Sequence, residues 1–202
     1  MLRKAPLALA LIGSFIATTA TAQSFTATLG VSSVNPKGGN GTLAGARASI
    51  DDDASTTASI AYAFDPNWSA ELWTGLGRFN HTVSLAGLGD VGKVSHRPTS
   101  LSVNYHFLPD SRFRPFVGVG YTRVSLSGVR AIGAIAGSDL SAGTSNGYNF
   151  NLGVDVAVAD NVFVRGDVRY LDFDTKVKLD GADIGTANVD PWVYGLSLGL
   201  RF

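Results

Sequence analysis

The chain ends in the stretch DPWVYGLSLGLRF, residues 190–202, and its last residue is an aromatic. Large apolar side chains occupy every second position from Trp192 to Phe202, and Val, Gly, Ser and Arg fill the positions between them. Because side chains of a β-strand point alternately to its two faces, the stretch predicts a strand with two unlike faces. A soluble barrel would bury the apolar face, whereas a membrane barrel would expose it to lipid.

The beginning of the chain indicates export. Arg3 and Lys4 precede an apolar run over residues 5–16, and small residues ending in Ala22 follow. This order is typical of a cleavable secretory signal, and the run is shorter than the roughly 20 residues that a spanning helix needs. We therefore expect a signal peptide at residues 1–22 and one barrel domain at residues 23–202.

The composition argues against several classes of function. Two of the 16 basic residues lie in the predicted signal, so the mature chain carries 14 basic and 16 acidic residues, a formal charge of −2. This balance suggests no nucleic-acid partner. The chain has no cysteine, and no stretch carries a recognisable signature of a nucleophile with its base or of a phosphate-binding loop. We expect neither an enzyme nor a bound cofactor.

Histidine is too scattered to predict a metal site. His81, His96 and His106 do not have the spacing of metal ligands. We expect His96 to pack against the base of a loop, and we assign no metal to the chain.

Eight segments of the mature chain have alternating or β-rich patterns and predict strands. They lie near residues 24–34, 54–64, 68–80, 99–107, 113–124, 147–158, 162–174 and 191–202. Three connections are short, at residues 65–67, 108–112 and 159–161. The other four are long and rich in Gly, Ser and Asp, near residues 35–53, 81–98, 125–146 and 175–190.

Strict alternation of short turns with long loops is the layout of an eight-stranded outer-membrane barrel. A soluble barrel of the lipocalin type also has eight strands, and its outer face would carry many Lys and Glu. Here the face opposite the apolar one is sparsely charged. We therefore predict an all-β fold, an eight-stranded antiparallel transmembrane β-barrel in the bacterial outer membrane, with long loops extracellular and termini periplasmic.

A small set of charged side chains is expected inside this barrel. Charges confined to a narrow lumen must be paired, because removing an ion from water is costly. Three acids and four arginines fall on the predicted inner faces, which is nearly balanced. The predicted lumen cluster is Glu71, Arg114, Asp155, Arg165, Asp167, Arg169 and Arg201.

Three stretches also resemble the OmpW family of small outer-membrane proteins. They are the closing DPWVYGLSLGLRF, GLGDVGKVSHRPTSLSVNYHFLPDSRFRPFVGVGYT at residues 87–122 and VRYLDFDTKVKLDG at residues 168–181. The resemblance extends over essentially the whole mature chain. It is poor in the long loops, and Thr99 follows Pro98 where such proteins often have a second proline.

The resemblance implies a hydrophobic channel that takes small apolar molecules across the lipopolysaccharide leaflet and releases them sideways into the membrane. Lipid, lipopolysaccharide and small hydrophobic ligands are then the expected partners. Apolar residues of the loops and two aromatic residues on inner faces could line the channel, although the loop residues could equally pack the loops together. The candidates for the lining are Leu43, Trp73, Leu85, Leu88, Phe116, Ile132 and Ile135.

A second reading of the function is a barrel that transports nothing. Its extracellular loops would serve adhesion, envelope integrity or recognition by phages and bacteriocins. Apolar residues inside the outer half of the lumen favour the channel, and a lumen closed along its length favours this alternative.

The carboxy-terminal alternation also suggests a route of assembly. It resembles the signal that the barrel insertion machinery of the outer membrane reads, which makes this machinery an expected partner. The residues of the predicted signal are Tyr194, Leu196, Leu198, Leu200 and Phe202.

Overall fold

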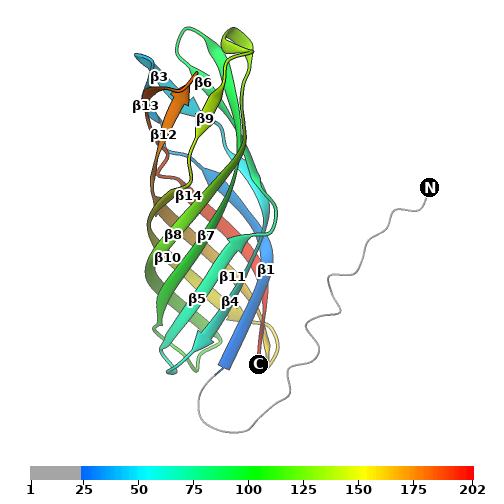
Figure 1. The fold of residues 1–202 in the computed structure, drawn as a ribbon. Helices are drawn as coiled ribbons and strands as arrows, with labels where there is room; N and C mark the ends of the chain where they lie inside the picture. Colours follow the sequence, from blue (N-terminus) through cyan, green and yellow to red (C-terminus); the bar gives the residue numbers. More distant parts are fainter. Residues whose placement is uncertain (1–23) are drawn as a thin grey trace, which may run out of the picture.

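The structure is a computed structural model that describes residues 24–202, so the predicted signal peptide lies outside the described residues. The chain forms a tall barrel with short turns at one end and long hairpins at the other (Figure 1). We call these the turn end and the hairpin end. No helix within residues 24–202 is long and apolar enough to cross a membrane.

Eight long antiparallel strands close the lower part of the barrel. Their order is β5-β4-β1-β14-β11-β10-β8-β7, and the pairing of β5 with β7 completes the cylinder. This arrangement confirms the predicted all-β, eight-stranded barrel. The strands are β1 (Ser24–Asn35), β4 (Asp53–Ala63), β5 (Trp68–Gly75), β7 (Gly89–His106), β8 (Phe113–Ala131), β10 (Ser145–Ala157), β11 (Val162–Asp172) and β14 (Trp192–Arg201).

The two faces of these strands differ as the alternation predicts. On β10, Phe150 exposes 55% of its surface, whereas its neighbour Asn149 exposes none. On β14, Leu196 exposes 60% and the inward Val193 exposes none. Large apolar side chains therefore cover the outside and polar ones fill the inside, which is the arrangement of a transmembrane barrel.

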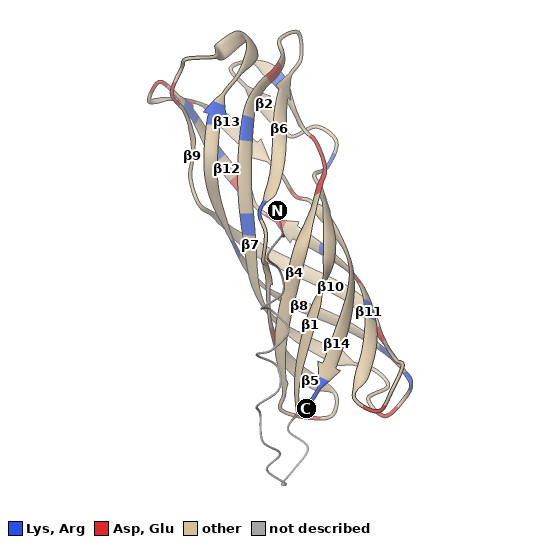
Figure 2. Ribbon diagram, turned by 90° about the vertical axis from the view of Figure 1, so that its right-hand side faces the viewer, with Lys and Arg blue, Asp and Glu red and all other residues tan. Residues whose placement is uncertain are grey.

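Aromatic pairs mark both rims of this apolar outer belt. At the hairpin end, the rings of Tyr121 and Tyr148 lie 6.3 Å apart, and at the turn end those of Trp68 and Tyr105 lie 4.9 Å apart. Just beyond Tyr121 the outward side chain of β8 is the exposed Arg123. Figure 2 shows further Lys and Arg positions on β7 at this level and above. The lipid-facing surface ends here, because aromatic girdles flank the apolar band and charges lie beyond it.

Two strands continue far beyond this belt. β7 has 18 residues and β8 has 19, whereas a tilted strand crosses the hydrocarbon core in about 9–11 residues. The prediction that residues 81–98 and 125–146 are loops is therefore wrong for residues 89–98 and 125–131. Glycine and serine replace bulky side chains in these segments, so the apolar signal fades although the strands continue.

Most of the remaining loop residues are also strand. They form β2 (Gly41–Leu43), β3 (Ala46–Ile50), β6 (Phe79–Leu85), β9 (Leu140–Ala142), β12 (Asp174–Leu179) and β13 (Ala182–Asn188), with the short 3-10 helix η1 (Gly133–Ile135). Together with the ends of β8 and β7, they make a curved wall in the order β8-β7-β6-β3-β2-β13-β12-β9. We call this wall the upper sheet.

The hydrogen-bonded wall is interrupted at one place that bears on function. β10 pairs with β8 only as far as Ser145 opposite Val124. Beyond that point β9 pairs with β12, and within residues 24–202 no ladder joins β9 to β8. We call the interval between β9 and the part of β8 beyond Val124 the β8–β9 seam.

Candidate functional site

Five of the predicted lumen charges form one connected ion network in the turn-end half of the barrel. Arg165 donates through Nη1 to Glu71 Oε2 at 2.7 Å and through Nε to Asp155 Oδ1 at 2.6 Å. Arg169 donates through Nη2 to Glu71 Oε1 at 2.5 Å and through Nε to Asp167 Oδ2 at 2.9 Å. Glu71 is fully buried and joins the two arginines, so three acids and two arginines form one network of ion pairs inside the barrel.

The other two predicted arginines lie outside this network. Within the described residues neither Arg114 nor Arg201 makes an ion pair. The guanidinium carbon of Arg201 lies 5.5 Å from the ring centroid of Phe163, and Arg114 Nε is buried without a hydrogen-bond partner. The sequence predicts one cluster of seven charges. In the structure, five of them form one network and the two arginines lie apart from it.

A polar layer fills the lumen beside the ion network. Asn104 donates to Glu71 and accepts from Asn151 at 2.9 Å. Ser102 donates to Asn149, which in turn donates to Thr122 at 3.1 Å. All these side chains are buried. An eight-stranded barrel encloses just enough room for side chains, and here they fill it with internal hydrogen bonds.

A layer of apolar side chains lies further toward the hairpin end, and we call it the apolar plug. Trp73 belongs to it and sits over the ion network, with the guanidinium carbon of Arg169 4.8 Å from its ring centroid. Trp73 is therefore packed within the plug and does not line the cavity described below. The plug consists of Val34, Trp73, Phe79, Val124, Leu171, Phe173, Val189 and Val193.

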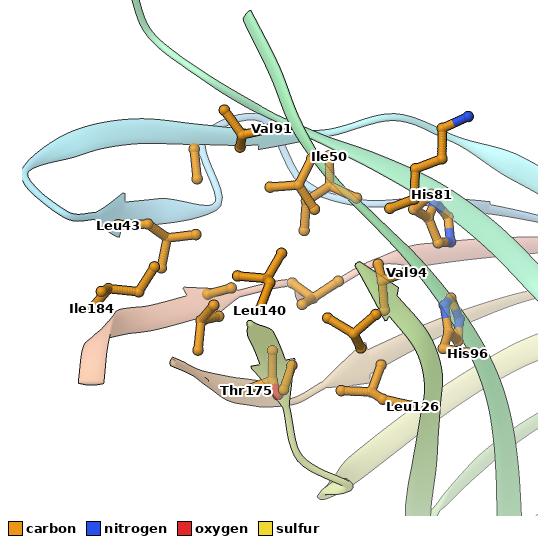
Figure 3. A pocket seen from close by; sticks show the side chains of 18 of the residues that line it. Leu43, Ile50, His81, Val91, Val94, His96, Leu126, Leu140, Thr175 and Ile184 are labelled. Atoms are coloured by element: carbon orange, nitrogen blue, oxygen red, sulfur yellow. The ribbon is translucent and has the colours of Figure 1, made fainter. Parts of the chain in front are cut away.

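The upper sheet surrounds an apolar cavity beyond the plug (Figure 3). Phe173 and Val189 belong to both, so the plug forms the floor of the cavity. Side chains from all four hairpins contribute to its wall. The lining residues are Leu43, Ala48, Ile50, His81, Val83, Leu85, Val91, Lys93, Val94, His96, Leu126, Val129, Ile135, Leu140, Ala142, Phe173, Thr175, Val177, Ile184, Ala187 and Val189.

Three of the seven predicted lining residues, Leu43, Leu85 and Ile135, lie on this cavity. Leu88 does not, because it lies in the turn after β6 and is 51% exposed. Ile132, just before η1, is also not part of the lining.

Phe116 lies in the other half of the barrel from the cavity. β8 enters the barrel at the turn end with Phe113, so a residue three positions later remains close to that end. Its ring centroid is 4.6 Å from the guanidinium carbon of Arg165, within the ion network.

Sequence reasoning missed the contribution of residues 175–190, which it treated as a loop. Val177, Ile184 and Ala187 from this segment line the cavity. A signal was present: Val177 alternates with two lysines, and Asp180-Gly181 follows, which is typical of a two-residue hairpin turn. The φ angles of Asp180 and Gly181 are 50° and 82°, as such a turn requires.

Two histidines lie side by side at one end of the cavity (Figure 3). The rings of His81 and His96 stack with 4.8 Å between centroids and 10° between planes, and His96 also stacks on Phe79 at 5.3 Å. His96 lies on β7 beyond the lipid-facing belt. Burial lowers the pKa of His96 from 6.5 to about 3, so this ring is neutral at physiological pH.

The residues of the predicted assembly signal lie on the outer face of β14. Tyr194, Leu196, Leu198 and Phe202 are exposed, and Leu200 is partly exposed. The backbone N–H of Phe202 donates to the carbonyl of Phe25 at 2.8 Å, so the last residue closes the barrel against β1. A role of this face in assembly stays a prediction.

Comparisons with known proteins agree with the architecture. The model of the OmpW family matches residues 13–202. Outer membrane protein W of Escherichia coli is 34% identical over 182 residues, covering 86% of this chain and 85% of that protein. Outer membrane protein AlkL of Ectopseudomonas oleovorans is 32% identical over 170 residues, covering 81% and 72%. The crystal structure of OprG from Pseudomonas aeruginosa superposes with a TM-score of 0.78 at 25% identity, covering 90% of this chain and 96% of that one.

Proposed function

The chain belongs to the OmpW family of outer-membrane barrels, and we propose on this basis that it passively carries small apolar compounds across the outer leaflet of the outer membrane. The observation that supports the proposal is the apolar cavity at the hairpin end. A lining made largely of aliphatic side chains suits ligands that lack charge.

The route of such a compound cannot continue straight down the barrel. The apolar plug lies directly below the cavity, and the ion network with its polar layer lies below the plug. An apolar solute would have to separate buried ion pairs to pass, which is strongly unfavourable. We propose that it leaves sideways instead.

The β8–β9 seam is the proposed exit. Leu126 and Val129 on β8 and Leu140 and Ala142 on β9 line the cavity from the two sides of this seam. Because no backbone ladder joins the two strands there, the wall can part without loss of ladder hydrogen bonds. The seam begins just above the aromatic rim at Tyr121, where the outer leaflet would lie.

The proposed orientation places the hairpin end outside the cell and the turns and termini in the periplasm. Long connections of outer-membrane barrels face outward and short turns face the periplasm. The exposed Arg97 and Arg123 on the outer face of β7 and β8 would then lie among the phosphate groups of lipopolysaccharide, which suits their charge.

The proposal predicts that filling the cavity stops uptake. Ala142 lines the cavity and is partly exposed, whereas its neighbour Ser141 points to the outside of β9. Ala142→Trp should reduce the uptake of apolar solutes into liposomes severalfold because the indole occupies the space of the ligand, and Ser141→Trp should leave uptake at the wild-type rate. Uptake is measured with the purified chain in liposomes for a panel of apolar solutes.

Empty liposomes give the background rate. If the wild-type barrel adds nothing to this background for any apolar solute, the transport proposal is wrong, and a barrel whose loops serve adhesion or recognition becomes the better account. Equal effects of the two tryptophan variants would place the route elsewhere than in this cavity.

A further inference from the structure

The wall of the cavity contains a polar feature that a purely hydrophobic channel does not need. Among the residues that line it, four have polar side chains: His81, Lys93, His96 and Thr175. Thr175 donates its hydroxyl to the carbonyl of Gly143 at 3.2 Å, and Lys93 is exposed. The two histidines remain as the buried side chains of the wall that each have an unpaired polar atom.

Each histidine has a ring nitrogen without a partner. Nε2 of His81 and Nε2 of His96 are buried and make no hydrogen bond with any residue of the described chain. Both residues are 4% exposed, and their stacked rings share one end of the cavity. Leaving a buried polar atom unpaired destabilises a protein, so two such atoms in neighbouring stacked rings at a cavity call for a partner.

The chemistry of that partner follows from the hydrogen bond that His81 already makes. Its Nδ1 lies 2.6 Å from the backbone carbonyl oxygen of Asp51. A carbonyl oxygen accepts and cannot donate, so Nδ1 carries the proton of the ring. In the neutral ring Nε2 then has a free lone pair and no hydrogen, and it can only accept.

We propose that His81 and His96 form a polar subsite that selects apolar molecules ending in a hydroxyl group. The hydroxyl donates its hydrogen to His81 Nε2, and its oxygen accepts from His96 Nε2 when that atom carries the ring proton. The hydrocarbon part occupies the aliphatic remainder of the cavity. This inference rests on the proposed function, because it requires that the cavity takes up small apolar molecules.

Other end groups satisfy the subsite less well. An ether, ester or aldehyde has an acceptor and no donor, so it leaves His81 Nε2 unpaired. An alkane leaves both nitrogens unpaired. A carboxylate would place its negative charge against the lone pair of His81 Nε2 in an apolar surrounding, which is unfavourable.

Two isomers test the proposal directly. n-Octanol and heptyl methyl ether contain the same atoms and have similar size, and they differ in whether the oxygen carries a hydrogen. Binding of each to the full chain in lipid nanodiscs is followed by the imidazole nitrogen chemical shifts, with concentration expressed as mole fraction in the lipid. We expect n-octanol to bind about tenfold more tightly, the ratio expected when one buried group gains its partner.

The matched variants locate the preference. His81→Phe keeps an aromatic ring in the stack and removes the acceptor, so the preference for n-octanol should vanish while the affinity for the ether stays unchanged. His106→Phe removes an imidazole from the lumen, where Nε2 of His106 lies 3.1 Å from Ser69 Oγ, and should retain the preference.

The wild-type protein alone can decide if the His81→Phe variant fails to fold. The proposal requires that n-octanol moves the Nε2 shift of His81 in the direction of a hydrogen-bonded acceptor and that the ether does not. Equal affinities for the two isomers would overturn the subsite and leave the transport proposal intact. Absence of binding of either isomer would overturn both.

Discussion

Arg169 is the single residue on which the interior of the barrel most depends. It forms ion pairs with Glu71 on β5 and with Asp167 on its own strand β11, and its guanidinium packs over the ring of Trp73 in the apolar plug. One side chain thereby joins the charged and apolar barriers of the lumen. Glu71 has a second partner in Arg165, whereas within the described residues Asp167 has no other ion pair.

Replacing Arg169 with Ala should strongly destabilise the folded barrel. Asp167, whose side chain is only 8% exposed, would keep its charge without a partner, and removal of one member of a buried pair costs about 3–5 kcal/mol. Denaturant unfolding of the refolded protein, followed by the heat-modifiable band, measures the loss.

Arg201→Ala is the control for that experiment. Arg201 contacts the ring of Phe163 and makes no ion pair with the described residues. Arg201→Ala should therefore lower the free energy of unfolding much less than Arg169→Ala does. Similar losses for both variants would show that Arg169 contributes through packing and not through its charge.

At the level of elements, the hairpin of β12 and β13 makes part of the cavity wall. Its turn, Asp180-Gly181, is tied to the segment before β9, because Asp180 accepts from the N–H of Asp139 at 2.7 Å and donates its own N–H back at 2.8 Å. Gly181 has a φ of 82°, a conformation that residues with a Cβ adopt only with strain. The wall therefore depends on a turn far from the membrane-spanning strands.

Gly181→Ala should loosen this hairpin and leave the barrel below unchanged. The left-handed conformation costs a residue with a Cβ about 1–2 kcal/mol, which corresponds to roughly tenfold faster amide exchange in β12 and β13 if they open locally. Hydrogen–deuterium exchange of the folded protein measures this.

Gly143→Ala is the matched substitution, because a Cβ at Gly143 meets no atom within 4 Å and its φ is not positive. It should change exchange in neither hairpin nor barrel. Acceleration in β1 and β14 by Gly181→Ala would contradict a hairpin that opens independently.

At the scale of the whole molecule, the lumen carries two barriers in series. The apolar plug excludes ions because they would lose their hydration, and the ion network below it fills the remaining space with paired charges. A molecule of this shape can bind at its hairpin end and still separate the two sides of the membrane.

The wild-type barrel should show no large, steady conductance in planar lipid bilayers, although liposomes containing it take up apolar solutes. Phe79→Ala removes the largest fully buried side chain of the plug and should still conduct poorly, because the ion network remains closed. Recordings at several salt concentrations, with an open porin as positive control, check both expectations. A steady ohmic conductance of the wild type would show that water fills the lumen and that a sideways exit is unnecessary.

The sequence alone determined the membrane-spanning part of this protein. Alternation in a strand is local. Tyr148, Phe150 and Leu152 could therefore be assigned to the outside, and Asn149 and Asn151 to the inside, without knowledge of the neighbouring strands. For the same reason the terminal stretch from Trp192 to Phe202 established two unlike faces before any strand pairing was known.

The upper sheet and its cavity could be known only from the tertiary structure. The cavity is built from four hairpins far apart in the chain, so Leu43, Leu140 and Val177 meet only because the upper sheet brings them together. The meeting of His81 with His96 depends on the β6–β7 ladder, whose register shifts between Val83 and Ser84. Register is set by long-range pairing and bulges, which no local pattern encodes, whereas the side of a strand on which a residue lies follows from its neighbours in the sequence.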